Sequence, residues 1–234
     1  MADIINAYYN ISVRQAEDIS GDEPRLVLAF ITKQGNNFIV SAQSTGELAS
    51  GLDDGPDLIN LNLPNRGRGS PGTVSGKIVS DNAPTVEEPF FALIAVAFDG
   101  DKSFDSHRER HRARFEASIQ EAITEIANQP GGFPANIDTG TLGGTLPAEW
   151  QNVVETMRDA ANVAMQRHWL IRDRDDAIGL PTCNIFSDLG NEFHSSGFAD
   201  DNGGFRYKKH FQSIFGSDGS LYNVNWSLTA NVNV

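Results

Sequence analysis

The chain has 234 residues, of which 39% are hydrophobic, and it carries a formal net charge of −13 at pH 7. This length allows one large domain or two small ones, and the apolar content is ordinary for a soluble globular protein. The acidic balance, with no basic stripe that could neutralise phosphates, argues against a nucleic-acid partner, and the single cysteine, Cys183, excludes an internal disulfide and a thiolate-rich zinc site.

The sequence carries no recognisable targeting signal. Residues 1–6 lack the basic region and the long apolar region of a secretory signal, and no apolar run is long enough to span a bilayer. We therefore expect a soluble protein that is not transmembrane and that is either cytoplasmic or exported by a non-classical route.

The first 42 residues predict three strands. Apolar and polar residues alternate from Ala7 to Val13, a period of two that is typical of a strand with one buried face. A turn-rich acidic loop follows over 17–24. The apolar run 25–32 and the segment 37–42, with a turn between them, then predict a β-hairpin.

The middle of the chain predicts a long loop and then a central strand. Residues 43–72 are rich in Gly, Ser, Asp, Asn and Pro and contain one short strand candidate at 58–63. A weak strand is predicted over 73–80. The segment 90–98 is apolar on both faces, which indicates a strand at the centre of a sheet.

Two helices are predicted where the apolar period changes from two to about 3.6. The first spans 106–128 and opens with a capping box of Ser106 and Glu109, and the second spans 147–167 with Pro147 in its first turn. We expect an antiparallel hairpin that packs on itself or on the sheet. The facing apolar stripes are Phe115, Ile119, Ile123 and Ile126 in the first helix and Val153, Val154, Met157 and Ala161 in the second.

The C-terminal third returns to strands, at 182–186, 205–215 and 221–232. The predicted fold class is therefore mainly β with a helical insertion. It is an antiparallel β-sandwich of about eight to ten strands with an α-helical hairpin inserted in one loop. We assign residues 1–234 to a single domain and residues 105–168 to the inserted hairpin.

Three acidic clusters each follow a predicted strand. In a sandwich, loops that leave the strands at one end lie side by side, so distant segments can meet around one ion. Carboxylates about 5 Å apart repel each other by roughly 1 to 3 kcal/mol per pair, and a cation relieves this repulsion. The clusters are Glu17, Asp18, Asp22 and Glu23; Asp99, Asp101 and Asp105; and Asp173, Asp175 and Asp176.

These motifs resemble the C-two domain, the calcium- and phospholipid-binding domain of protein kinase C and synaptotagmin. The family's first calcium loop reads Asp, two residues, Gly, then an acid and Pro before a strand, and Asp18-Ile19-Ser20-Gly21-Asp22-Glu23-Pro24 has that spacing. A later loop reads Asp-x-Asp, a few residues, Asp, then Ile-Gly. Here Asp99-Gly100-Asp101 matches its opening and Asp176-Ala177-Ile178-Gly179 matches its close.

The chain also departs from the family pattern. Glu23 stands where the family usually has Asp, Arg25 stands where it favours an aromatic residue, and the segment 102–175 separates the two halves of the later loop. The resemblance therefore implies a helical hairpin inside a calcium loop. It implies calcium as the cofactor, and a protein or membrane surface as the partner.

The acidic clusters and the resemblance together predict one metal site. Calcium takes about six to eight oxygen ligands, more than one segment supplies. The alternative interpretation is that these acids are turn formers and solvated loop charges. The predicted metal ligands are Asp18, Glu23, Asp99, Asp101, Asp173, Asp175 and Asp176.

Other motifs point to weaker alternatives. His107 and His111 stand four residues apart, a spacing that can place two imidazoles on one metal. A zinc peptidase needs Glu directly after the first histidine, so we interpret both residues as solvated helix surface. The sequence contains no nucleophile elbow, phosphate-binding glycine loop or dinucleotide fingerprint. Trp150, Trp169 and Trp226 are in apolar register, which indicates core packing.

The sequence supports three functional hypotheses. The first is a non-enzymatic binding module with a calcium-binding acidic rim. The second is a structural or assembly protein on the same fold, whose acidic loops and helical hairpin meet neighbouring subunits of a homo-oligomer. The third and weakest is a metal-dependent hydrolase that uses the carboxylates with His107 or His111.

Overall fold

The structure, a computed structural model, describes residues 4–15, 24–45, 73–84, 90–99, 105–133, 148–165, 176–186, 205–216 and 220–232. Nine strands and two helices lie within these ranges. They are β1 (Ile4–Gln15), β2 (Pro24–Gln34), β3 (Asn37–Ser44), β4 (Thr73–Ser80), β5 (Phe91–Asp99), α1 (Asp105–Asn128), α2 (Ala148–Met165), β6 (Asp176–Ala177), β7 (Thr182–Phe186), β8 (Phe205–Gly216) and β9 (Leu221–Val232).

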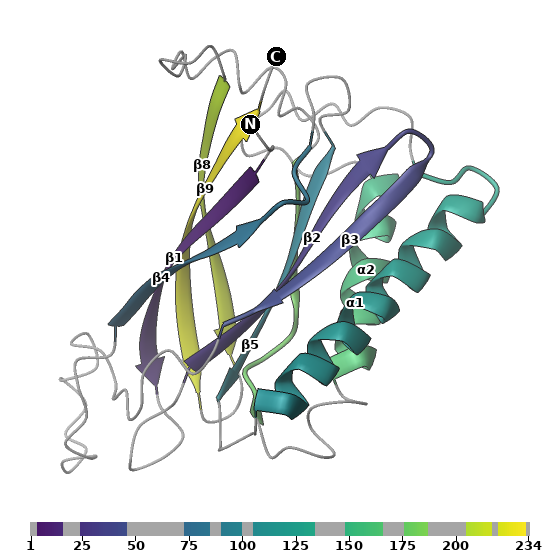
Figure 1. The fold of residues 1–234 in the computed structure, drawn as a ribbon. Helices are drawn as coiled ribbons and strands as arrows, with labels where there is room; N and C mark the ends of the chain where they lie inside the picture. The colour runs from purple at the N-terminus through teal and green to yellow at the C-terminus, as the bar shows by residue number, and fades with distance from the viewer. Residues whose placement is uncertain are drawn as a thin grey trace, which may run out of the picture.

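The strands form two sheets in which the neighbouring strands are antiparallel (Figure 1). The four-stranded sheet has the order β4-β1-β9-β8, so the first described strand pairs with the last. The five-stranded sheet has the order β3-β2-β5-β6, and β7 also pairs with β5. The protein is thus mainly antiparallel β, with two helices.

Strand β5 contributes to two hydrophobic cores. Leu93 and Ala95 lie in a cluster that includes residues of both sheets, which we call the between-sheet core. Ile94 and Val96 lie in a cluster shared with both helices, which we call the helix-side core. The expectation that this strand is apolar on both faces and central is confirmed.

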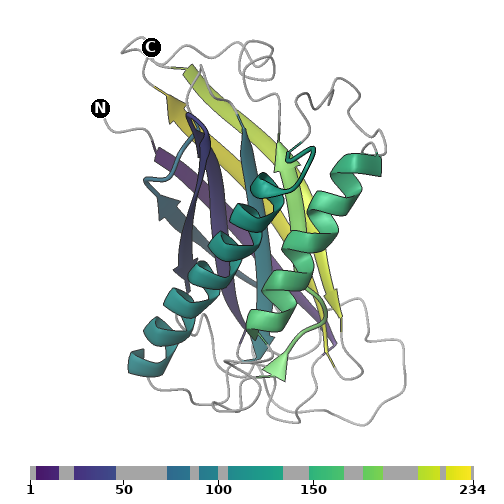
Figure 2. The ribbon, with the colours of Figure 1, turned by 90° about the vertical axis from the view of Figure 1, so that its right-hand side faces the viewer.

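The two helices cover the face of the five-stranded sheet that points away from the four-stranded sheet (Figure 2). The sheet presents Val27, Ile31 and Val96 on this face, so the face needs an apolar cover. The helical stripes therefore pack on the sheet as well as on each other, and Val154 is only partly buried. The stripe residues in the helix-side core are Phe115, Ile119, Ile123, Ile126, Val153, Met157 and Ala161.

The helical pair is inserted between two strands that pair with each other. The chain leaves the sheet at Asp99, the last residue of β5, and re-enters it at Asp176, and the register pairs these two residues. Along the insertion the two helices run in opposite directions (Figure 2). Both predicted helices are therefore present, with bounds within a few residues of those expected, and the assignment of 105–168 as an insertion within one domain remains a prediction.

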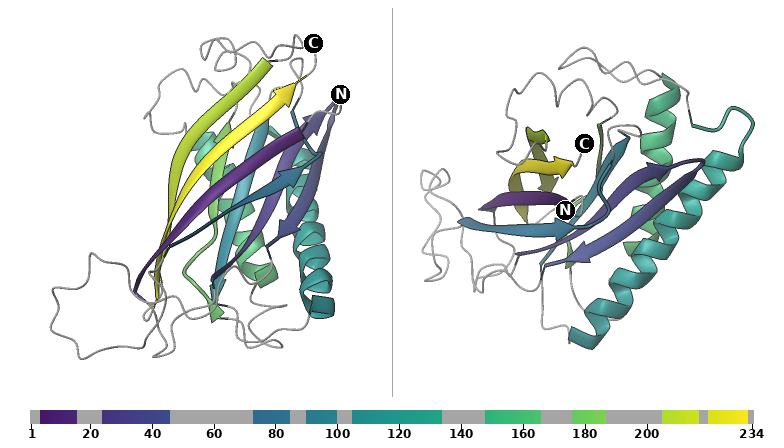
Figure 3. Two further views of the ribbon diagram at one scale, coloured as in Figure 1. Left: turned by 60° about the vertical axis from the view of Figure 1, so that its left-hand side comes forward. Right: turned by 45° about the horizontal axis from the view of Figure 1, so that its top comes forward.

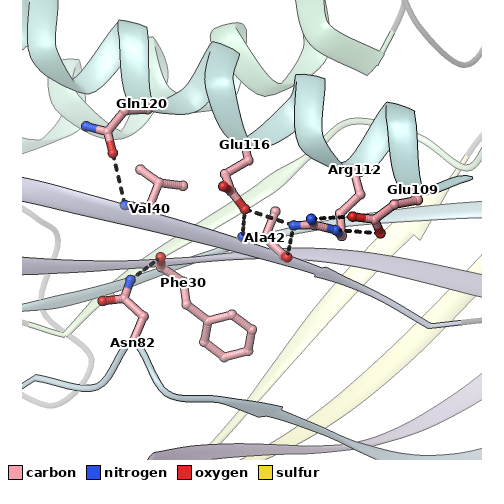
Figure 4. Close-up of polar contacts among 8 residues, drawn as sticks. All are labelled: Phe30, Val40, Ala42, Asn82, Glu109, Arg112, Glu116 and Gln120. Carbon is pink, nitrogen blue, oxygen red and sulfur yellow. Dashed lines mark hydrogen bonds and ion pairs between the residues drawn. The ribbon is translucent and has the colours of Figure 1, made fainter.

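Helix α1 also covers the outer edge of the sheet along β3, the edge strand (Figure 4). The backbone N–H groups of Ala42 and Val40 donate to the side-chain oxygens of Glu116 (2.8 Å) and Gln120 (3.1 Å). Gln120 Nε2 donates to the carbonyl of Phe38 at 3.0 Å, and Arg112 Nη1 donates to the carbonyl of Ala42 at 2.6 Å. Side chains of α1 thus take the place that a further strand would occupy.

Some expectations fall on other parts of the chain. The strand candidate at 58–63 lies outside the described residues. The single-domain assignment of 1–234 remains a prediction. Within the described part of the chain, neither helix has the length and apolar character needed to cross a membrane.

Candidate functional site

Strand positions beside all three acidic clusters meet at one end of the five-stranded sheet. The register pairs Asp99 with Pro24 at the start of β2 on one side, and with Asp176 at the start of β6 on the other. In the sequence, Pro24 directly follows the first acidic cluster, and Asp176 is the last residue of the third. Cα atoms opposite each other in an antiparallel pair are about 4.5–5.5 Å apart. The backbone of three distant segments therefore converges at Asp99.

Asp99 itself is a buried carboxylate. It is 4% exposed, although it ends its strand and begins the second acidic cluster. Since Ala95 and Ala97 lie in the between-sheet core, the alternation along β5 places Asp99 on that same face. The returning chain is held there by a hydrogen bond of 2.9 Å from the amide of Ile178 to the carbonyl of Ala97.

Gly179 fixes where this returning chain meets the other sheet. Its φ of +72° is in the left-handed region, which glycine adopts without steric cost. A Cβ atom at this position would lie 2.6 Å from both the backbone nitrogen and oxygen of Gly216, the last residue of β8. The Ile-Gly corner that sequence analysis associated with the third cluster is thus a close backbone contact between the two sheets.

Arg25 was noted in the sequence only as a departure from a family pattern, yet it is buried at the same end of the sheet. It is paired with Phe98, the residue before Asp99, and its guanidinium carbon lies 5.6 Å from the centroid of the Phe98 ring. Phe98 belongs to the helix-side core. Its positive charge therefore lies at this end of the sheet but on the helix side, the face opposite to that of Asp99, and the sequence signal for it was a charged residue directly before an apolar run.

The structure describes only part of the predicted ligand set. Asp99 is described in full, and Asp176 is described by its backbone alone. Among the described residues, no group of three or more His, Cys, Asp or Glu side chains is placed to hold a metal ion. The ligand set therefore stays a prediction, because Asp18, Glu23, Asp101, Asp173 and Asp175 lie outside the described residues.

The histidine interpretation needs one correction. His111 is 3% exposed and is not solvated helix surface as expected. It precedes the apolar stripe by one turn of α1, since Phe115 follows four residues later, and the helix turns that whole face towards the sheet. The side chain of His107 lies outside the described part of the structure.

Cys183 is unsuited to nucleophilic chemistry. The residue packs against the helix-side core, and its thiol is enclosed although the residue as a whole is only partly buried. Burial raises the pKa of the thiol to about 12, and nearby Arg158 opposes the shift only in part. Because the thiolate is the nucleophile and the metal ligand, this shift disfavours both roles for Cys183 near neutral pH.

Trp150 and Trp226 lie in the helix-side and between-sheet cores, as their apolar register predicted.

The fold and this end of the sheet define a mainly antiparallel β protein with a helical pair inserted beside a buried acidic position. Comparison with protein-family models, with curated proteins and with solved structures gives no match to this chain. The likeness to the C-two domain therefore remains a prediction from the sequence motifs.

Proposed function

We propose that the protein is a non-enzymatic binding module, a β-sandwich similar to the C-two domain. Its acidic loops bind calcium and contact a membrane surface or a protein partner. The acids are the required kind of ligand, because calcium prefers carboxylate and carbonyl oxygens. Asp99 and Asp176 would hold the ion, with the remaining oxygens supplied by Asp18, Glu23, Asp101, Asp173 and Asp175.

One observation carries this proposal. Asp99 is buried at the end of β5, and its backbone partners are Pro24 and Asp176, which adjoin the other two acidic clusters. Like charges that share a small volume disfavour ionisation, and burial of a carboxylate adds a further cost. A divalent cation offsets both costs, because it supplies positive charge at the point where the three segments converge.

Calorimetric titration of the chelator-treated protein with calcium tests the proposal. We expect binding heat for the natural sequence and none for the double variant Asp99→Asn, Asp101→Asn, because the amides keep the shape and lose the charge. The melting temperature should rise with calcium concentration in the natural sequence only, since a ligand that binds the native state alone stabilises it.

Asp81→Asn is the matched control. Asp81 is exposed and follows β4, and its neighbour Asn82 accepts a hydrogen bond from the hydroxyl of Thr32, at the opposite end of β2 from Pro24. This variant should bind calcium like the natural sequence. If the natural protein gives no heat and no change in melting temperature at millimolar calcium, the proposal is wrong. If calcium does bind, sedimentation with phosphatidylserine vesicles, with and without calcium, separates a membrane partner from a protein partner.

A further inference from the structure

The outer face of the four-stranded sheet has basic residues and no acidic ones. The inward side chains of this sheet, such as Ile11 and Trp226, form part of the between-sheet core, so alternate positions belong to the outer face. In the left view of Figure 3 this sheet lies in front, with the five-stranded sheet and the helices behind it. We call the even-numbered positions of β1 and β8 and the odd-numbered positions of β4 and β9 the outer sheet face. None of these positions holds Asp or Glu.

The basic positions lie mainly on the two edge strands of this face. Lys77 is exposed in β4, and Arg206 and Lys208 stand at outer positions of β8, the opposite edge. Alternation along β1 adds Arg14, beside a shift of register at the end of that strand. Three spacings of about 4.8 Å separate the edge strands, roughly 14 Å in all. These residues are far apart in the chain, so the sequence shows no basic stripe and the strand order creates one.

Uncharged hydrogen-bonding side chains lie between the two edges. One row crosses all four strands through Ser75, Asn10, Asn225 and Gln212. Asn10 Nδ2 donates to Ser75 Oγ at 2.7 Å, and Gln212 Nε2 donates to Asn225 Oδ1 at 3.4 Å. The row therefore presents amide and hydroxyl groups at the regular spacing of the strands.

The neighbouring row adds an exposed aromatic ring. Tyr8 is 43% exposed and is paired with Lys77 on one side and with Ser227 on the other. The ammonium of Lys77 lies 5.9 Å from the centroid of the Tyr8 ring. The face thus presents a ring and a cation together, beside the row of amides.

Protection of the sheet edges is a simpler explanation for charge on β4 and β8, because charged residues on an edge strand discourage pairing with other chains. That protection does not depend on the sign of the charge. The chain has 31 acidic residues and 18 Lys and Arg, yet every charged position of the outer sheet face is basic. Edge protection also leaves unexplained why Asn10, Asn223 and Asn225 occupy the inner strands, where asparagine is normally depleted. Residues that break local preference without a packing gain are expected at functional sites.

We propose that the outer sheet face binds an anionic polysaccharide, a polymer whose sugar rings carry carboxylate or sulfate groups. Lys and Arg at the edges pair with the anionic groups, and the amides and hydroxyls between them match the hydroxyls of the sugar rings. The Tyr8 ring offers an apolar surface to the less polar face of a sugar. Charges more than about 8 Å away are largely screened at physiological ionic strength, so the local basic face acts in spite of the net charge of −13.

Other anionic partners fit this face less well. Nucleic acid carries a denser row of charges than these few cations neutralise. A membrane surface would pair with the basic residues but gives the row of amides no specific role. A second copy would bury the amides, and each would then need a new partner, since an unsatisfied buried amide is costly. Asp99 lies on the other sheet, so the inference goes beyond the calcium proposal and does not rest on it.

Surface plasmon resonance on immobilised polymers tests the inference, at physiological ionic strength and with a chelator throughout. Polygalacturonate carries carboxylates, chondroitin sulfate carries both groups, dextran sulfate carries sulfates, and dextran is the matched neutral polymer. We expect binding to at least one anionic polymer and none to dextran. Lys77→Glu should weaken the binding at least tenfold and Tyr8→Ala several-fold. Arg110→Glu, the same change of charge at an exposed position of α1, should leave it unchanged.

Three results would overturn the inference. The first is no binding to any anionic polymer. The second is an equal loss of binding in Lys77→Glu and Arg110→Glu, which would assign the effect to net charge. The third is equally tight binding to phosphatidylserine vesicles in chelator, or a dimer in sedimentation, that Lys77→Glu abolishes. The melting temperature of each variant confirms that it is folded, and where Lys77→Glu melts early, Lys208→Glu on the opposite edge strand decides the outcome.

Discussion

At the residue scale, Gly179 is restricted both by its own φ and by a neighbouring backbone segment. It combines a φ of +72° with the backbone of Gly216 at 2.6 Å from the place of a Cβ atom. We predict that Gly179→Ala lowers the free energy of unfolding by more than the roughly 1–3 kcal/mol of a strained φ alone. The added cost arises because a backbone neighbour cannot rotate away as a side chain can. Urea unfolding measures the difference.

Gly35→Ala separates the two contributions. Gly35 has a φ of +61°, in the turn between β2 and β3, but no atom lies within 4 Å of the place of its Cβ. Its replacement should show the cost of the positive φ without the clash. Equal losses of stability in the two variants would mean that the contact between Gly179 and Gly216 adds nothing.

At the scale of elements, α1 protects the edge strand β3. Exposed strand edges are templates for pairing with another chain, and proteins cover or interrupt them. We predict that Glu116→Ala with Gln120→Ala lowers the free energy of unfolding by about 1–3 kcal/mol, because two backbone amides of β3 lose their partners. Light scattering at high protein concentration should show earlier self-association of this variant.

Glu121→Ala is the control for that experiment. Glu121 is exposed on the same helix, so its loss changes charge and helix propensity without exposing the edge of β3. It should leave both stability and scattering close to those of the natural protein. Self-association of Glu121→Ala to the same degree would assign the effect to net charge.

At the scale of the whole molecule, β5 joins the two cores. Its alternate residues pack under the helices and between the sheets, so loss of one core removes support from the other. We predict that Ile94→Ala, on the helix side of β5, lowers the free energy of unfolding by about 2–5 kcal/mol. The loss should be the same for the segments around both cores. Hydrogen exchange in urea, followed for peptides of α1 and of β9, should show that both lose protection at the same lowered denaturant concentration.

Val163→Ala provides the comparison, because Val163 is a large hydrophobic residue exposed on α2. The substitution should leave the protection of the α1 and β9 peptides from hydrogen exchange almost unchanged. Loss of protection in α1 at a urea concentration where β9 of the Ile94→Ala variant is still protected would show two independent units. The assignment of residues 1–234 to a single domain would then be wrong.

Local periodicity in the sequence was enough to predict most of the elements. The double-sided apolar run of β5, the alternation in β1 and β9 and the apolar stripe of α1 each depend on residues a few positions apart. Such patterns reflect which side of an element is buried, and that choice is made within the element itself. The acidic clusters could likewise be recognised beside predicted strands, but the rim that they would form stays a prediction.

Apart from the hairpin predicted for 25–32 and 37–42, tertiary structure decided which strands are neighbours. The pairing of β1 with β9, and of Asp99 with Asp176 across the helical insertion, joins segments with no shared local pattern. The burial of His111, the contact of Gly179 with Gly216 and the cover of β3 by Glu116 and Gln120 likewise depend on which surfaces fit together. Periodicity indicates that a face is buried but does not indicate which surface covers it, because the energy of that choice depends on the packing of the whole chain.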